Sequence, residues 1–381
     1  MAARICVLTS VHRPFDGRIF HRECIALAQA GYSVTLVAPA DFGKEQRDGV
    51  RVLGVPRPAR RRQRPLTWWR LLRQVLRLRP DVVHFHDPEL LLLVPLLRLR
   101  FGRRVKLVYD VHEYFVDSLA NKHWIPPRLR PAVAAVARRL ERRLVRGVDG
   151  LLLAVDGQRA LHPHFRGPVA VVRNLPVARL FEDAVPEPAL DVPGLRLIYV
   201  GLILPQRGID TLLEALGLLR RQGIDDVHLF LVGPETSRDY LDELDAIAPQ
   251  EQVHRLGYVP HDRLKHYLAN AHVGLVPGRH TAQYTRPNIA TKLFEYMLCG
   301  LPILTVDNPH WQQYVEEGQC GLVVPAGDAA AYARAILYLR AHPAEARAMG
   351  ERGRAMVLNR YTWEQEQSRL LEFYQAILER K

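Results

Sequence analysis

The stretch TRPNIATKLFEYMLCGLPIL, residues 285–304, predicts a loop, a helix of about two and a half turns, a stop and a buried strand. Apolar side chains recur in it at the three- and four-residue spacing of one helix face: Leu293, Phe294, Met297 and Leu298. Pro287 suits the approach to a helix, and Gly300 followed by Pro302 suits its end. A helix followed by a buried strand is typical of an α/β fold.

Lys292 and Glu295 are three residues apart, so they are neighbours on the surface of this helix. The first turn of a helix presents N–H groups without intrahelical partners and a partial positive charge, which favour a phosphate or an anionic sugar nucleotide. An ordinary solvated ion pair on an amphipathic helix explains the same two residues. The pair becomes specific only in combination with other phosphate-binding features.

The chain of 381 residues is long enough for two domains, and its composition of 48% hydrophobic and 24% charged residues is that of a globular protein. Its four cysteines are scattered and form no C-x-x-C pair, which argues against structural zinc and a disulfide framework and suits a reducing cytoplasm. No run reaches the roughly 18 uncharged apolar residues of a membrane-spanning helix. We therefore expect a cytoplasmic protein that is soluble or peripheral on the inner face of the membrane.

The net charge of +13, from 53 Lys and Arg against 40 Asp and Glu, favours anionic partners. An arginine-rich composition gives the same surplus without any partner, so the charge is informative only where it is clustered. The sequence contains no recognised nucleic-acid-binding module, and we expect no nucleic acid partner.

Short apolar strands alternate with helices along the first half of the chain. The pattern predicts strands at 4–10, 33–38, 50–55, 81–86, 105–110, 150–154 and 169–173, and helices at 18–30, 66–79, 88–100 and 131–146. This alternation implies a parallel sheet with helices on both faces, which is a doubly wound, Rossmann-like α/β domain.

The alternation is interrupted once and then restarts. Residues 178–194 are rich in Pro, Ala and acidic side chains and have no clear period, so they are predicted to be a linker. We predict an N-terminal Rossmann-like domain over 1–177, a second one over 195–360, and a final helix over 361–381 that either caps the second domain or returns to the first. Two such domains face each other across a cleft, with ligands at the carboxyl ends of the strands.

Polar residues end two strands of the first domain: His84, His86 and Asp87 after one, and Asp110, His112 and Glu113 after the next. His84 and His86 share a face because strand side chains alternate. Two histidines and a carboxylate can hold zinc or iron, but the other ligands of such a site are missing at recognisable spacing. We therefore predict no metal site and expect these residues to line the cleft and contact a polar substrate.

Two strand-to-helix turns have features of diphosphate-binding loops. Gly17 follows the first strand, and a glycine in such a turn lets backbone N–H groups approach a phosphate. Arg207 lies in the turn after strand 195–200 and is suited to grip a diphosphate at a helix N-terminus. A plain turn and a surface arginine are the alternatives. Arg207 and Lys292 converging on one cleft are more specific than either residue alone.

Two segments of the first domain combine arginines with aromatic side chains. Residues 57–64 are basic and precede Trp68 and Trp69, and Trp124 precedes an arginine-rich helix. Such segments suit the headgroup layer of an anionic membrane, and solvated loops and helix faces are the alternative.

Taken together, the motifs resemble those of the retaining glycosyltransferases of family four, which have the GT-B fold of two facing Rossmann-like domains. The motifs that carry the resemblance span nearly the whole chain: DGRIFHRE (16–23), DVVHFHD (81–87), YDVHE (109–113), NLP (174–176), YVG through RG (199–208) and KLFEYM through GLP (292–302). The combination is specific for the family and does not identify a substrate.

The resemblance implies a role for each matching residue. Glu295 is expected to bind the ribose hydroxyls of a nucleotide-sugar donor, Arg207 and Lys292 to neutralise its diphosphate, the Gly17 loop to cover the phosphates, and His112 to contact the transferred sugar. Protein cations then stabilise the leaving diphosphate, so no metal and no cofactor are expected.

The chain departs from the family pattern at two positions. The family usually has two glutamates eight positions apart, and here the first position is Pro287, which gives a Pro-x4-Lys-x2-Glu-Tyr-Met variant. Backbone groups of Asn288, Ile289 and Ala290 are expected to replace that carboxylate. Leu202 stands where the family often has an arginine, which leaves Arg207 and Lys292 as the main cations for the diphosphate.

We therefore expect a metal-independent retaining glycosyltransferase that moves a sugar from a UDP- or GDP-linked donor to a lipid-linked or polysaccharide acceptor. A sugar-nucleotide epimerase or a phosphorylase on the same fold is a second hypothesis. A non-catalytic scaffold that binds nucleotide sugars or polyanions is a third, because the carboxylate at position 287 is missing.

Overall fold

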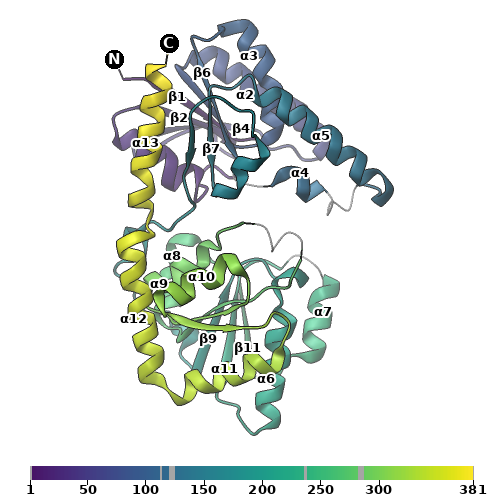
Figure 1. The fold of residues 1–381 in the computed structure, drawn as a ribbon, viewed down its shortest axis with the longest axis vertical. Coiled ribbons are helices and arrows are strands. Elements are labelled where there is room, and N and C mark those ends of the chain that lie inside the picture. The colour runs from purple at the N-terminus through teal and green to yellow at the C-terminus, as the bar shows by residue number, and fades with distance from the viewer. Residues whose placement is uncertain (1, 112–113, 120–124, 236–237, 282–286, 381) are drawn as a thin grey trace. The chain divides into compact units, whose positions relative to one another are not determined.

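In the computed structural model the chain forms two compact units, 1–174 together with 364–381, and 175–363 (Figure 1). The structure describes residues 2–111, 114–119, 125–235, 238–281 and 287–380. Each unit is built on its own sheet, which agrees with the two Rossmann-like domains predicted from the sequence.

The first unit contains an eight-stranded sheet in the order β3-β4-β2-β1-β5-β6-β7-β8. Its strands are β1 (Arg4–Leu8), β2 (Ser33–Pro39), β3 (Lys44–Arg47), β4 (Val50–Val55), β5 (Val82–Phe85), β6 (Lys106–Val111), β7 (Gly150–Leu153) and β8 (Val169–Val171). Edge strand β3 runs antiparallel to β4, and the other pairings are parallel. The sequence pattern did not predict β3, because its residues KEQR are polar throughout.

Helices cover both faces of this sheet (Figure 1). They are α1 (Ile25–Gln29), α2 (Arg64–Leu78), α3 (Val94–Phe101), α4 (Phe115–Ser118) and α5 (Arg130–Val145), with shorter helical turns between them. On one face, Cys6 and Leu8 of β1 share a core with Leu71 of α2. Strand side chains alternate, so Ile5 and Val7 are buried on the opposite face.

The predicted helix over 18–30 is not a continuous α-helix. A π-helical segment, η1 (Ile19–Cys24), precedes α1, and the backbone N–H of Glu23 donates to the carbonyl of Arg18 at 3.0 Å. The wider turn is typical of π-helical segments, which are often found at functional sites. Here it brings Arg18 and Glu23 into the buried network described below.

The second unit contains a six-stranded parallel sheet in the order β11-β10-β9-β12-β13-β14. Its strands are β9 (Leu195–Val200), β10 (Val227–Val232), β11 (Val253–Gly257), β12 (Val273–Val276), β13 (Ile303–Val306) and β14 (Gly321–Val324). Its helices are α6 (Ile209–Arg221), α7 (Arg238–Ile247), α8 (His261–Ala269), α9 (Thr291–Leu298), α10 (Pro309–Gly318), α11 (Ala329–Ala341) and α12 (Pro343–Arg360).

The segment predicted to be a linker packs on the second unit instead. Phe181 and Leu190 are buried in its core, with 8% and 0% of their surface exposed, and the N–H of Glu187 donates to the carbonyl of His266. The sequence analysis did not predict this packing, because the two buried apolar residues stand in a mainly polar segment and follow no helical or strand period.

The last helix, α13 (Trp363–Glu379), belongs to the first unit from Glu364 onward. Its Tyr374 hydroxyl contacts His84 Nδ1 at 2.8 Å, and a Cβ at Gly150 would lie 2.1 Å from Ile377. Glycine at the start of β7 therefore allows the helix to approach the sheet closely. None of the described helices is both long enough and apolar enough to cross a membrane.

Candidate functional site

The second sheet has a switch point at β9, whose neighbours β10 and β12 lead away in opposite directions. Ligands of open α/β sheets bind at such a point, outside the carboxyl ends of the strands. The turn that follows β9 contains Gly201 and Arg207, and the segment after β12 leads to α9 with Lys292 and Glu295. Three residues predicted for the donor site, Arg207, Lys292 and Glu295, are therefore on segments that follow the strands at this switch point.

Two glycines let the backbone approach closely where β9 and β10 end. Gly233 has φ +145°, and a Cβ there would lie 2.0 Å from the carbonyl oxygen of Gly201. Gly201 has φ +142°, and its Cβ would lie 2.7 Å from Lys292 Nζ. Both glycines are therefore needed to leave room for the lysine and the crossing backbone.

Lys292 points its ammonium group toward the end of β9. Nζ lies 4.1 Å from the centre of the Tyr199 ring, a cation–π distance. Loss of water around the ammonium group, followed by the nearby charge of Arg207, lowers the pKa of Lys292 well below its usual range, although Glu295 opposes the shift. The site thus holds a poorly hydrated cation beside a second one, an arrangement that an anionic ligand would relieve.

Arg207 ends the short 3-10 turn η9 (Pro205–Arg207) and is half-buried. Gly208 follows with φ +68° and is the N-cap of α6, so the turn passes into the helix through a left-handed residue. A Cβ on Gly208 would come within 3.4 Å of the Gly278 backbone. The glycine therefore keeps the loops after β9 and β12 close together.

Glu295 is buried in α9, with 6% of its surface exposed. Its Oε1 lies 2.8 Å from Nε2 of His261, which begins α8, and the His261 ring packs edge-on against Phe181. The sequence analysis identified Glu295 but missed His261 and Phe181. The signal for them is weak, because a histidine after Pro260 and a phenylalanine in a polar segment match no motif.

Asn288 and Ile289 lie just before α9 and are half-buried. Asn288 Oδ1 accepts a hydrogen bond from Trp311 Nε1 of α10 at 2.8 Å, and Ile289 packs against the core of the unit. The segment that leads to Lys292 is thus held by a side-chain bond on one side and apolar packing on the other. Tyr296 adds a third constraint, because its hydroxyl accepts from the Val200 N–H at 2.8 Å.

Gly17 lies in the first unit, in the turn between β1 and η1. Its carbonyl accepts a hydrogen bond from Arg22 Nη1 at 2.7 Å. Asp16 shapes the same turn by accepting from the N–H groups of Arg18 and Ile19 at 2.8 and 3.0 Å. Burial acts to raise the pKa of Asp16, but bonds from His12 and these N–H groups prevail and hold it well below its usual range.

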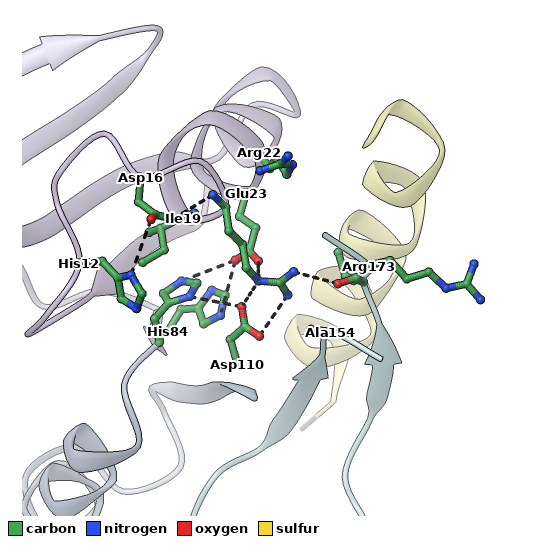
Figure 2. A network of polar contacts seen from close by, with 12 residues as sticks. His12, Asp16, Ile19, Arg22, Glu23, His84, Asp110, Ala154 and Arg173 are labelled. Carbon is green, nitrogen blue, oxygen red and sulfur yellow. Dashed lines mark hydrogen bonds and ion pairs between the residues drawn. The ribbon is translucent and has the colours of Figure 1, made fainter. Parts of the chain in front are cut away.

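Behind this turn, Figure 2 shows a buried polar network centred on Glu23 and Asp110. Arg18 Nε lies 2.8 Å from Asp110 Oδ2 and 3.0 Å from Glu23 Oε1, and its Nη1 donates to the carbonyl of Val172. Burial and the charge of Asp110 raise the pKa of Glu23 well above its usual range, although Arg18 opposes the shift. One guanidinium thus lies between two buried carboxylates, Glu23 and Asp110.

His84 and His86 belong to the same network, which corrects the prediction that they line a cleft. They are 0% and 1% exposed, and Nδ1 of His86 lies 3.2 Å from Asp110 Oδ2. His84 is on β5, a central strand with neighbours on either side, and His86 directly follows this strand, so both are covered by the elements packed on the sheet. Asp87 is also buried, and it accepts bonds from Thr9 and Ser10 of the β1 turn.

Among the described residues, four side chains could together hold a metal ion: Glu23, His84, His86 and Asp110, whose ligand atoms lie within 4.8 Å of one another. Arg18 already places a cation between the two carboxylates, at 2.8 and 3.0 Å. A metal ion would therefore have to displace a buried guanidinium. The arrangement suits a structural network that joins η1, β5, β6 and α13 better than a metal centre.

His112 and Glu113, predicted as a sugar contact and a cleft residue, lie outside the described residues. Their strand, β6, ends at Val111, and α4 begins at Phe115. The four cysteines are free thiols, as the sequence led us to expect.

Comparison with known proteins identifies the class. Residues 17–178 match the family model described as "Glycosyl transferase 4-like domain", and residues 194–342 match "Glycosyl transferases group 1". Each model covers one of the two units, and together they span most of the chain. The chain belongs to the glycosyltransferases that have the GT-B fold.

Several known proteins are similar over most of their length. A GDP-mannose-dependent alpha-(1-6)-phosphatidylinositol monomannoside mannosyltransferase of Mycobacterium tuberculosis is 25% identical over 76% of this chain and 82% of its own. A sucrose-phosphate synthase from Thermosynechococcus elongatus has a TM-score of 0.77 at 20% identity, covering 98% of both chains. HepE from Anabaena, solved in complex with UDP-glucose, has a TM-score of 0.72 at 15% identity and covers 98% of this chain and 100% of its own.

Proposed function

We propose that the chain is a retaining glycosyltransferase of the family-four type that transfers a sugar from a nucleoside diphosphate sugar without a metal ion. The observation that carries the proposal is the dehydrated Lys292 ammonium group beside Arg207, at the switch point of the second sheet. Two neighbouring cations favour a dense negative charge such as a diphosphate.

In this mechanism the cations act mainly on the leaving group. As the bond between the sugar and the diphosphate breaks, negative charge grows on the diphosphate oxygens, and Lys292 and Arg207 stabilise it. Glu295 accepts hydrogen bonds from the ribose hydroxyls, and its contact with His261 at 2.8 Å orients the carboxylate beforehand.

The donor and acceptor classes are suggested by similar proteins. The mycobacterial relative is named for GDP-mannose and a phosphatidylinositol glycolipid, and HepE was solved with UDP-glucose. We propose a GDP- or UDP-linked hexose as the donor and a lipid-linked or polysaccharide acceptor.

We further propose that the enzyme works on the surface of an anionic membrane. Exposed apolar residues follow α5 and the turn before it at the three- and four-residue spacing of one helix face: Leu129, Val133, Val136 and Leu140. Arginines flank this stripe on the same helix, and apolar side chains bordered by cations suit an interfacial helix.

The test is thermal stabilisation by UDP, GDP, UDP-glucose and GDP-mannose, each with and without EDTA. A ligand at a hundred times its Kd should stabilise the protein by about 2.7 kcal/mol. A rise in Tm that is the same with and without EDTA and is lost in Glu295→Gln supports the proposal, and the nucleotide that causes it identifies the base of the donor. A shift abolished by EDTA contradicts metal independence, and the absence of any shift contradicts a nucleotide-sugar donor.

Turnover separates the enzymatic hypotheses. Release of UDP or GDP that requires an added acceptor supports transfer. Conversion of the donor sugar without an acceptor would identify an epimerase, and binding without turnover would identify a scaffold.

A further inference from the structure

A basic pocket lies at the edge of the first sheet where β6 and β7 begin. It has a volume of about 490 Å³, and its lining residues all belong to the first unit. Seven cationic side chains contribute to it: Arg98, Arg103, Lys106, Arg142, Arg146, Arg166 and Arg380. The carboxyl ends of the same strands form the opposite edge, so the pocket is separate from the position at which open α/β sheets usually bind substrates.

Acidic side chains balance only part of the positive charge of the basic pocket, and one of them, Glu141, has its Oε1 3.9 Å from His162 Nε2. Asp149 is the carboxylate among its lining residues, and it is engaged by Arg98 Nη2 at 2.5 Å and by the Leu107 N–H at 2.7 Å. Within the described parts of the chain, no carboxylate forms an ion pair with Arg142 or Arg146. The volume therefore contains a net positive potential.

A histidine in the wall of the pocket, His162, has a pKa that is lowered in part by this positive charge. His162 is buried there, and burial followed by the charge of Arg142 lowers its pKa to about 4. The imidazole is therefore neutral near pH 7 and can donate or accept a hydrogen bond.

The floor of the pocket is apolar. Val145, Val148 and Ile377 are at most 7% exposed, and Phe165 is half-buried beside them. Arginines around an apolar floor suit a ligand with an anionic head and an apolar body. The volume is also larger than one phosphate ion requires.

We propose that the basic pocket binds a phosphate monoester that bears an apolar group, at a site separate from the nucleotide-sugar site. Arginine guanidinium groups match phosphate oxygens in a bidentate geometry, and Arg142, in the last turn of α5, is four residues before Arg146, the C-cap of this helix. The ligand is either a soluble phosphate ester or the headgroup of a lipid such as phosphatidic acid. The proposal does not depend on the glycosyltransferase function.

The first experiment is calorimetric titration with hexyl phosphate, with hexyl glucoside as the neutral probe. We compare the parent chain with Arg142→Gln/Arg146→Gln and with the control Arg334→Gln/Arg347→Gln, which removes the same charge from exposed arginines outside the pocket. The pocket variant should bind hexyl phosphate at least about tenfold more weakly, while the control keeps the parental Kd. Equal weakening in both variants would overturn the proposal, as would a failure of the parent chain to bind both hexyl phosphate and phosphatidic acid vesicles.

Competition distinguishes the basic pocket from the donor site. Saturating UDP or GDP should leave the Kd of hexyl phosphate unchanged, and Lys292→Met should bind hexyl phosphate normally. Displacement by either nucleotide would mean that the phosphate occupies the donor site and would overturn the proposal. If the nucleotides themselves fail to bind, the proposed function fails and this inference is untouched.

Vesicles identify the source of the phosphate. Phosphatidylcholine vesicles that contain phosphatidic acid are compared with vesicles of equal surface charge that contain phosphatidylglycerol, a diester. Stronger binding to phosphatidic acid that is lost in the pocket variant assigns the site to a lipid headgroup. Binding of hexyl phosphate without a preference for phosphatidic acid assigns it to a soluble ester. Binding to both kinds of vesicle that is unaffected in the pocket variant, with no binding of hexyl phosphate, overturns the proposal.

Discussion

Lys292 has an environment that costs the nucleotide-free protein stability. Its pKa is lowered first by desolvation and then by Arg207, whereas in the unfolded chain the group has its ordinary pKa. Between those two values the unfolded state binds more protons than the folded state, so stability rises with pH over that range. Below the folded-state pKa the full cost of the buried charge is present. Such a cost is expected of a residue that binds an anionic ligand, as we propose for Lys292 and the donor diphosphate.

We predict that Lys292→Met lowers kcat with either donor by about 10²- to 10³-fold, because one cation that stabilises the leaving group is removed. The same variant should raise the Tm of the nucleotide-free protein, and by more at pH 7 than at pH 10. Donor turnover and melting curves at the two pH values measure both effects. Turnover within threefold of the parent would contradict the proposed role of Lys292.

The pKa shift of Glu23 makes the stability of the fold change with pH in the opposite direction. Its folded-state pKa is raised, chiefly by burial and by Asp110, so it stabilises the fold fully below its unfolded pKa of about 4.3 and loses that contribution as pH rises. We predict that the Tm of Glu23→Gln minus the Tm of the parent increases from pH 5 to pH 8. A relative loss at pH 8 would mean that Glu23 is ionised beside Arg18. Glu23→Ala is the control for lost packing.

At the scale of elements, two strand ends depend on glycine. Gly233→Ala should destabilise the protein by about 2–4 kcal/mol, since the residue has φ +145° and the new Cβ would meet the Gly201 carbonyl. Gly223→Ala is the matched control, because Gly223 has φ +78° in open space and should lose only about 1 kcal/mol. The urea concentrations at the unfolding midpoints of the two variants and the parent measure these losses of stability. Equal losses would show that the close approach of the strands contributes nothing.

The exposed stripe on α5 allows a second prediction about an element. Val136→Asp/Leu140→Asp should reduce sedimentation with anionic vesicles severalfold and leave the Tm nearly unchanged, because 68% and 43% of these side chains are exposed. Ile247→Asp/Leu358→Asp, at 42% and 47% exposure on the second unit, is the control. If both variants sediment like the parent, the stripe is not the membrane-binding face.

At the scale of the whole molecule, the chain crosses between its two units twice. The second crossing returns α13 to the first unit, where Tyr374 meets His84 across 290 residues of sequence. The stability of the first unit therefore depends on residues that are far from it along the sequence. Each unit has its own core, so the two can unfold in separate transitions.

We predict that Tyr374→Phe lowers the stability of the first unit by about 1–2 kcal/mol and leaves the second unchanged, because it removes a buried partner of His84. Tyr332→Phe is the control: Tyr332 is 1% exposed in the second unit, and its hydroxyl has no partner among the described residues. Nucleotide-induced shifts identify which transition belongs to the second unit. A loss shared by both transitions would mean that the units unfold together.

Much of the fold could be predicted from the sequence. Strands such as 195–200 and 227–232 are mainly apolar, each with one polar residue at its second position, and a strand buried on both faces must be largely apolar. Lys292, Glu295 and Arg207 could be predicted as donor-site residues because each is in a strand–turn–helix motif whose phosphate-binding features are close together in sequence. Strand β3 and the anchors of 178–194 were missed because their signals are not periodic.

The sequence by itself determined the two α/β domains and the cationic residues of the candidate donor site, because both depend on residues that are close together along the chain. Only the tertiary structure decided the place of His84 and His86, since strand alternation puts them on one face but cannot say that Arg18, Glu23 and Tyr374 will cover them. It also decided the His261–Glu295 contact and the basic pocket. These features join elements that are distant in sequence, and their free energies depend on burial and on neighbouring charges that no local pattern contains.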